Sequence, residues 1–279
     1  MGFLPYVLLV MVPGLVLSLW AAYRVRSAFG KWDKVDSGIS MNAFDFARYL
    51  LNAQGLNQVT VEPTPGTLTD HYDPRTRTLR ISTGVAHTAG GRQSFNPLGG
   101  GGIGGGMGGG PMGRGRMGAP MGRGYAYGVS TVPADAPLNG RLSVAQVAVI
   151  AHEVGHAQQH ARGDLMMKVR QAVVPVAQIG TTFAPWLVII GVFMRITGLA
   201  VVGLAFFAGA VAFTFVTLPV EFGASRRALA FVEPLGLTGE RGQGAREVLR
   251  AAGWTYVAAA LTALLTFLYY LSLVSGTRR

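Results

Sequence analysis

The segment His152-Glu153-Val154-Gly155-His156 places two histidines four residues apart, with a glutamate between them. Residues four apart lie on one face of an α-helix, so both imidazoles can bind the same zinc ion. The glutamate then lies beside the metal, where it can accept a proton from an activated water. The pattern therefore predicts zinc-assisted hydrolysis, with His152 and His156 as metal ligands and Glu153 as the general base. The alternative is a histidine pair that packs in a helix without a metal.

The residues around this motif favour a helix that could carry such a site. Ser143 is a suitable N-cap, Gln146 completes a capping box with it, and Gly163 is a suitable helix end. An apolar run, residues 144–151, leads into the motif. We therefore expect the motif to lie in the middle of a helix, among small and apolar residues that exclude water. This setting favours the metal-binding interpretation.

The composition is typical of a membrane protein. Half of the 279 residues are hydrophobic and 13% are charged, whereas a soluble domain averages about 25% charged residues. The absence of cysteine excludes disulfides and leaves histidine and carboxylate as the strong zinc ligands. We attribute the net charge of +11 to basic residues that face anionic membrane lipid, and we expect no nucleic-acid partner.

Four apolar segments are long enough to cross a bilayer, which takes about 20 residues. They are residues 3–23, 173–194, 196–220 and 251–274. The first is interpreted as a retained anchor, because its basic residues follow the apolar core instead of preceding it as in a signal peptide. The second and third predict a transmembrane hairpin, and Pro175 and Pro185 are expected to bend its first span.

The distribution of basic residues predicts the orientation of these spans. Residues 24–170 contain sixteen of the 24 lysines and arginines, and residues 221–250 contain five. With four spans, both segments lie on one side, which the positive-inside rule makes the cytoplasmic side. Arg195, Arg278 and Arg279 then lie on the outer side, as do both chain ends.

Between the first two spans the sequence predicts soluble structure. Residues 40–54 favour an amphipathic helix that ends at Gly55, residues 59–61 a short strand, and residues 69–82 a hairpin with its turn at 73–76. The hairpin is either purely structural or a place where an extended substrate peptide pairs. Residues 88–128 contain eighteen of the forty glycines and are interpreted as a disordered insertion.

We therefore expect a mainly α membrane protein with about four transmembrane helices and a cytoplasmic, zincin-like α+β catalytic portion. The chain is divided into seven segments: a transmembrane anchor (1–23), a cytoplasmic helix and β-hairpin (24–87), a Gly/Met/Arg-rich insertion (88–128), the zinc-binding helix (129–170), a transmembrane hairpin (171–220), a cytoplasmic helix with the third zinc ligand (221–250) and a C-terminal transmembrane helix (251–279).

A catalytic zinc ion needs a third protein ligand. His160 lies about 12 Å beyond His152 along a straight helix, so the two cannot share one metal. The metzincin spacing requires a histidine where this chain has Arg162. Glu221, at the cytoplasmic end of the hairpin, is the favoured candidate, unless it is only a helix-start carboxylate favoured by the helix dipole. Its competitors lie in a more polar stretch: Glu233, Glu240 and Glu247.

The segment 152–160, the hydrophobic hairpin after it and Leu218-Pro219-Val220-Glu221-Phe222 resemble the YugP-like neutral zinc metallopeptidases of bacterial membranes. Residues 68–74 and 255–260 take part in the resemblance, which covers nearly the whole chain outside the insertion. The layout is also similar to that of the gluzincin-like HtpX and CAAX-protease group, where a glutamate after a transmembrane hairpin completes the site. Many relatives carry an acidic or amide residue two places after this glutamate, where this chain has Gly223.

The resemblance implies a Zn²⁺ enzyme of the bacterial inner membrane, with His152, His156 and Glu221 as ligands and Glu153 as the base. We expect a metalloendopeptidase with protein or peptide substrates at the cytoplasmic membrane face. His71 and His160 are candidates for orienting a substrate or holding an oxyanion. Two alternatives stay open: an intramembrane protease of the site-2 type, and a catalytically silent membrane scaffold or quality-control adaptor.

Overall fold

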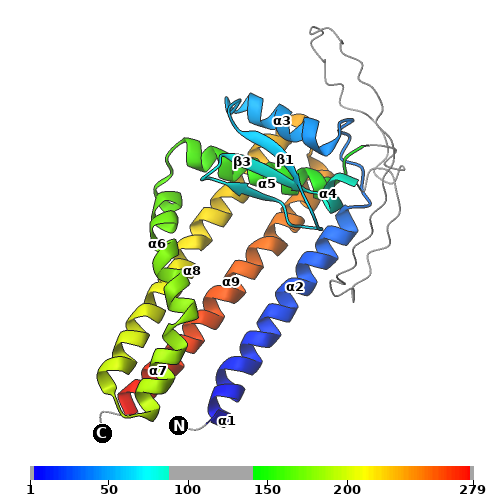
Figure 1. Cartoon of the computed structure of the whole chain (residues 1–279). Helices are drawn as coiled ribbons and strands as arrows, with labels where there is room; N and C mark the ends of the chain where they lie inside the picture. The colour runs from blue at the N-terminus through cyan, green and yellow to red at the C-terminus, as the bar shows by residue number, and fades with distance from the viewer. Residues whose placement is uncertain (1–2, 88–140, 277–279) are drawn as a thin grey trace, which may run out of the picture.

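The computed structural model describes residues 3–87 and 141–276. Long helices form a bundle, and a small sheet lies at one end of it together with α3 (Ala43–Ala53), α4 (Thr83–His87) and α5 (Val144–Ala161) (Figure 1). The first and last described helices begin and end at the opposite end of the bundle (Figure 1). The expected insertion, residues 88–128, lies outside the described residues.

Three helical segments are long and apolar enough to cross a membrane: Leu4–Trp32, Thr197–Leu235 and Gly239–Gly276. A further pair, α6 (Leu165–Thr182) and α7 (Ala184–Phe193), passes the same test jointly and is bent by 41°. The described residues thus hold three candidate spans, or four when the bent pair is one span. This confirms a mainly helical chain with about four candidate membrane-spanning helices.

The bend in the pair lies directly before Pro185, which occupies the first turn of α7. Proline suits a first turn because the N–H it lacks would have no partner within the helix there. Pro175, by contrast, lies inside α6 without ending it. The expected bend is thus confirmed at Pro185, whereas the bend expected at Pro175 stays a prediction.

The helices cross several of the expected segment boundaries. The first continuous helical stretch consists of α1 (Phe3–Tyr6), a π-helical turn (Val7–Met11) and α2 (Val12–Trp32), and so passes residue 23. Two further helices also cross expected boundaries. They are α8 (Thr197–Val232), which is followed by a 3₁₀ turn (Glu233–Leu235), and α9 (Gly239–Gly276). Polar residues after an apolar run do not interrupt a helix, because the backbone hydrogen bonds continue regardless of side-chain polarity.

The soluble portion contains a three-stranded sheet in the order β1-β3-β2. The predicted hairpin is confirmed, since β2 (His71–Asp73) pairs antiparallel with β3 (Thr78–Ser82). In addition, β1 (Thr60–Thr64) pairs parallel with β3, which the sequence did not indicate. The expected amphipathic helix is α3 (Ala43–Ala53), and it begins later than Ser40 because the Asn42 side chain caps it.

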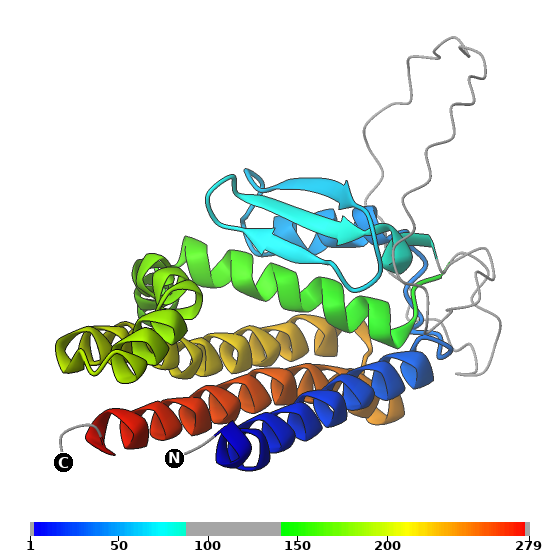
Figure 2. The ribbon, with the colours of Figure 1, turned by 60° about the horizontal axis from the view of Figure 1, so that its bottom comes forward.

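The motif helix is α5 (Val144–Ala161), which lies between the sheet and the bundle (Figure 2). The expected capping box is present: Ser143 Oγ accepts from Gln146 N–H, and Gln146 Oε1 accepts from Ser143 N–H. Ser143 Oγ also donates to Asp33 Oδ1, just after α2, at 2.8 Å. The buried core around α5 includes side chains from α3, β3 and α5: Phe46, Leu50, Leu79, Ile81 and Ile150. A short helix, α4 (Thr83–His87), follows β3.

Candidate metal centre

Helices α5 and α8 approach each other closely where Gly155 meets Ala224. A Cβ atom added at Gly155 would lie 2.7 Å from the carbonyl oxygen of Ala224, a distance that real Cβ atoms do not reach. The glycine inside the histidine motif therefore permits the close approach. As a result, the motif of α5 lies directly against the segment of α8 that carries Glu221.

This approach brings together the three side chains that were expected to bind zinc. The Oε2 atom of Glu221 lies 3.3 Å from His152 Nε2 and 3.4 Å from His156 Nε2. One ligand atom from each of the three residues lies within 4.8 Å of the other two. Glu221 is 2% exposed and His156 is 7% exposed. Two imidazoles and one carboxylate form a donor set that catalytic zinc sites use, so the residues present fit a zinc ion.

The position of Glu221 also excludes one of the two interpretations of this residue. Because α8 is continuous from Thr197 to Val232, Glu221 lies well inside the helix and is not a helix-start carboxylate. The competing carboxylates are elsewhere: Glu247 accepts hydrogen bonds from Lys31 and Trp32, and Glu233 and Glu240 are exposed. Within the described ranges, Glu221 is the carboxylate that lies with both histidines.

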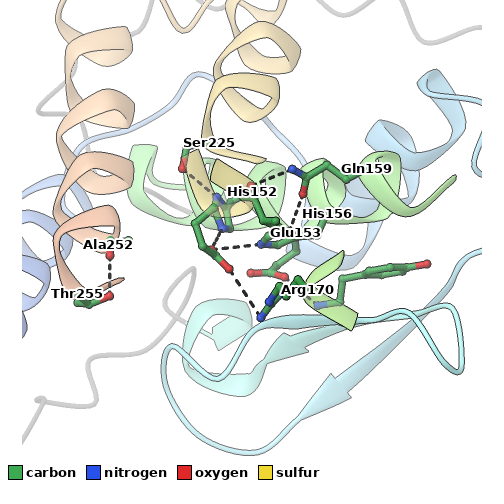
Figure 3. Close-up of polar contacts among 11 residues, drawn as sticks. His152, Glu153, His156, Gln159, Arg170, Ser225, Ala252 and Thr255 are labelled. Carbon is green, nitrogen blue, oxygen red and sulfur yellow. Dashed lines mark hydrogen bonds and ion pairs between the residues drawn. The ribbon is translucent and has the colours of Figure 1, made fainter. Parts of the chain in front are cut away.

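Each histidine has a polar partner on the ring nitrogen that faces away from Glu221. Gln159 Nε2 donates to the Val220 carbonyl oxygen at 2.8 Å, and this bond orients the amide. Gln159 Oε1 then accepts from His156 Nδ1 at 2.9 Å, which leaves the Nε2 lone pair available to a metal. His152 Nδ1 lies 3.2 Å from Ser225 Oγ. Figure 3 shows Ser225 and Gln159 on opposite sides of the histidine pair.

Gly223 is explained by the same arrangement. A Cβ atom at residue 223 would lie 2.8 Å from Gln159 Nε2, so the Gln159 amide already occupies the space beside this glycine. In many relatives, an acidic or amide residue at this position supplies a polar group that Gly223 lacks. Instead, α5 supplies an amide from a different part of the chain. The pairing of Gln159 with Gly223 therefore preserves a polar partner for His156.

We expect Gln159→Leu to weaken zinc binding by about 10- to 100-fold, because groups that orient a metal-binding histidine typically contribute this much. The substitution removes the amide oxygen that accepts from His156 Nδ1. It also removes the amide N–H that donates to the Val220 carbonyl oxygen. Competition with a chelator of known zinc affinity measures the change. Gln158→Leu is the matched control, because this neighbouring buried amide bonds to Gln54 instead of the histidines. Equal zinc affinities for the two variants would contradict the assignment.

Glu153 is held by the edge strand of the sheet. The backbone N–H of Tyr72, in β2, donates to Glu153 Oε2 at 2.8 Å. Burial raises the pKa of the Glu153 carboxyl to about 7. The side chain is 9% exposed and lines a cavity that His156 and Glu221 also line. A carboxylate with this environment and position can exchange a proton with a group in the cavity.

The cavity has a volume of about 390 Å³ and lies between α5, α6, α9 and the β2 hairpin. Both additional histidines line it. His160 Nδ1 lies 2.9 Å from the Tyr72 hydroxyl, and His71 Nδ1 lies 2.8 Å from the Thr69 carbonyl oxygen. Neither belongs to the three-residue metal group. This agrees with the helix spacing, which excludes His160 as a ligand to the same metal as His152.

Sequence reasoning missed four contributors to this site: Tyr72, Gln159, Arg170 and Ser225. The backbone of Tyr72 holds Glu153, and Arg170 lines the cavity from α6. Tyr72 lies in one of the segments that carried the family resemblance, so a signal for its importance was present. Nothing in the local sequence around Arg170 or Ser225 indicates which helix each one faces, because that depends on how the helices pack.

Comparison with known proteins agrees with this geometry. A family model described as "Putative neutral zinc metallopeptidase" matches residues 7–90 and 134–275. The chain is 31% identical over 268 residues to a Bacillus subtilis (strain 168) protein named "Putative membrane protease YugP", and the match covers 96% of each chain. No solved structure was found to match. Three residues positioned for a metal ion fit the zinc in the family description. This chain therefore belongs to the family described as "Putative neutral zinc metallopeptidase".

Proposed function

We propose that this protein is a membrane-bound zinc metalloendopeptidase. The observation that carries the proposal is the convergence of His152, His156 and Glu221 within 4.8 Å, with Glu153 lining the same cavity as His156 and Glu221. The name of the Bacillus subtilis relative supports a protease at a membrane. The family description supports zinc as the metal that the three side chains hold.

In this proposal, His152, His156 and Glu221 would hold the zinc ion, which would supply a Lewis acid that makes water nucleophilic and polarises a carbonyl. Glu153 accepts one proton from the water as its oxygen adds to the carbonyl carbon of the scissile bond. The Tyr72 N–H fixes the carboxylate that receives this proton. Glu153 then delivers the proton to the amide nitrogen as the C–N bond breaks, so the base is restored.

We infer that the site faces the cytoplasm and acts on protein or peptide substrates at the inner membrane of a bacterium. The candidate spans support a lipid-embedded bundle, and the sheet and α5 lie at the end of it opposite the two described chain ends (Figure 1). Of the 24 basic residues, 21 lie in the two segments assigned to that side, as the positive-inside rule requires.

The structure favours this proposal over the two alternatives from the sequence. For a site-2 type, the motif helix should span the membrane, but α5 is not among the candidate spans found in the described residues. Moreover, α5 carries Gln146, Gln158 and Gln159, which are buried between the sheet and the bundle. A silent scaffold would need the ligands for structure, but it would not need Glu153 directed into the cavity.

Metal removal tests the proposal. We expect full-length protein purified in detergent to contain about one zinc per chain and to cleave casein, as three ligands and a base predict. A chelator should end the cleavage, and added Zn²⁺ should restore it. Zinc content is measured by atomic spectroscopy and cleavage by release of acid-soluble peptides. A metal-free protein that cleaves casein, or a zinc-loaded one that leaves every tested protein intact, would contradict the proposal.

A further inference from the structure

Arg170 is a charged residue of α6 that has few polar partners among the described residues. It lines the cavity, and its Nη2 atom lies 3.9 Å from Glu221 Oε1. Its Nε atom is buried and has no hydrogen-bond partner among the described residues. Figure 3 shows the side chain of Arg170 directed toward His152, Glu153 and His156 of α5. Among the described residues, the guanidinium thus has one long ion-pair contact, to Glu221, and its side chain is 30% exposed.

An arrangement of this kind is unfavourable unless a ligand completes it. The buried Nε–H of Arg170 is a donor without a partner, which costs free energy until an acceptor reaches it. A guanidinium offers five N–H groups in a planar fork that matches two oxygens of one anion. These facts indicate that Arg170 binds an anionic group that enters the cavity.

The contacts of Glu221 show where that anion should lie. Its Oε2 atom faces the two histidines and its Oε1 atom faces Arg170. Arg170 therefore lies next to the atoms that hold the metal, and not at a distant part of the cavity. A donor in this place acts on the reacting carbonyl group rather than on a carboxylate elsewhere in the substrate.

We propose that Arg170 is a catalytic residue that stabilises the anionic tetrahedral centre formed during peptide hydrolysis, an inference that rests on the proposed function. When the water oxygen bonds to the carbonyl carbon, the π electrons of the C=O bond move to the carbonyl oxygen. That oxygen becomes an anion, and Arg170 donates hydrogen bonds to it. The carbonyl of the bound substrate is neutral, so the interaction strengthens as the reaction proceeds and lowers the barrier.

Two matched inhibitors separate this role from a structural one. The first is a phosphinic pseudo-dipeptide with phenylalanine before and alanine after the phosphorus, which carries a tetrahedral anion in place of the scissile amide. The second is the hydroxyethylene analogue of the same sequence, which is tetrahedral but neutral. We expect Arg170→Gln in the zinc-loaded protein to weaken phosphinate binding by about 10- to 100-fold, the usual effect of removing a charged donor. Binding of the hydroxyethylene analogue should change by less than about 3-fold.

The controls address charge, folding and the metal. Lys168→Gln removes one positive charge from an exposed position of the same helix outside the cavity lining, and phosphinate binding should be unchanged. Arg170→Lys keeps the charge without the fork and should fall between wild type and Arg170→Gln. Zinc content and melting temperature are measured for all three variants. For peptide cleavage, Arg170→Gln should lower kcat with little change in KM.

The inference would be overturned by equal losses for both inhibitors, by loss of zinc from Arg170→Gln, or by a rise in KM with kcat unchanged. The last would assign Arg170 to a substrate carboxylate. Inhibitor binding is measured without turnover, so failure of this inference is distinguishable from failure of the proposed function, which depends on zinc and casein cleavage. Absence of phosphinate binding to the zinc-loaded wild type would also overturn it.

Discussion

Glu153→Gln is expected to lower the rate of peptide hydrolysis by about 10²- to 10⁴-fold, the usual contribution of a positioned general base. The amide has the shape of the carboxylate but cannot accept the proton that leaves the attacking water. Its Oε1 atom can still accept the hydrogen bond from Tyr72 N–H that the carboxylate accepts at 2.8 Å. The change should therefore remove the chemistry and preserve the local structure. Cleavage rates and zinc content of the purified variant measure both effects.

The zinc content separates loss of the general base from loss of the metal. His152, His156 and Glu221 are unchanged in Glu153→Gln, so the variant should bind as much zinc as the wild type. A variant that binds zinc normally and cleaves casein at the wild-type rate would exclude Glu153 as the base. If the variant binds zinc but is inactive, a proteomic comparison of cells that carry the wild type or Glu153→Gln would identify substrates. These would be the proteins that accumulate only in the variant.

Glu221→Gln is expected to weaken zinc binding by about 100-fold or more and to end peptide hydrolysis. Structural zinc sites bind with about 10–16 kcal/mol, so the loss of one of three protein ligands should cost about 3 kcal/mol. The carboxylate lies 3.3 and 3.4 Å from the two histidine Nε2 atoms, and it is the negatively charged member of the donor set. Zinc affinity is measured by competition with a chelator.

A matched substitution shows whether the effect belongs to this position. Glu240→Gln removes a carboxylate that is exposed and lies outside the metal group, so it should leave zinc affinity and cleavage unchanged. Melting temperatures of both variants separate loss of zinc from loss of the fold. The ligand assignment fails if Glu221→Gln retains wild-type zinc affinity in a folded protein.

The two histidines and Glu153 were predictable because all three belong to one helix. Their relative positions depend only on the helical repeat, and the start of the helix was also encoded locally. Ser143 and Gln146 form the capping box that the sequence indicated, and Gly163 follows the last turn of α5 with a positive φ of 65°. The apolar runs likewise identified the candidate spans, because bilayer thickness sets their length.

The helix ends were less predictable. The polar residues after the apolar run predict a boundary at 220, but α8 continues to Val232. The parallel pairing of β1 with β3 also escaped prediction, because it joins strands that are not adjacent in the sequence. Local patterns identify an element more reliably than they identify its limits or its partners.

The local sequence therefore accounts for the part of the site that one helix carries: His152, Glu153 and His156, with their spacing on α5. The packing of the other elements accounts for the groups that reach them from elsewhere. It brings Glu221 of α8 to both imidazoles, directs Gln159 into the space beside Gly223, and places the Tyr72 backbone on Glu153 and Arg170 beside Glu221. Contacts within a helix follow from its regular geometry, whereas contacts between helices depend on how closely the backbones pack. Here that packing depends on the absence of a side chain at Gly155.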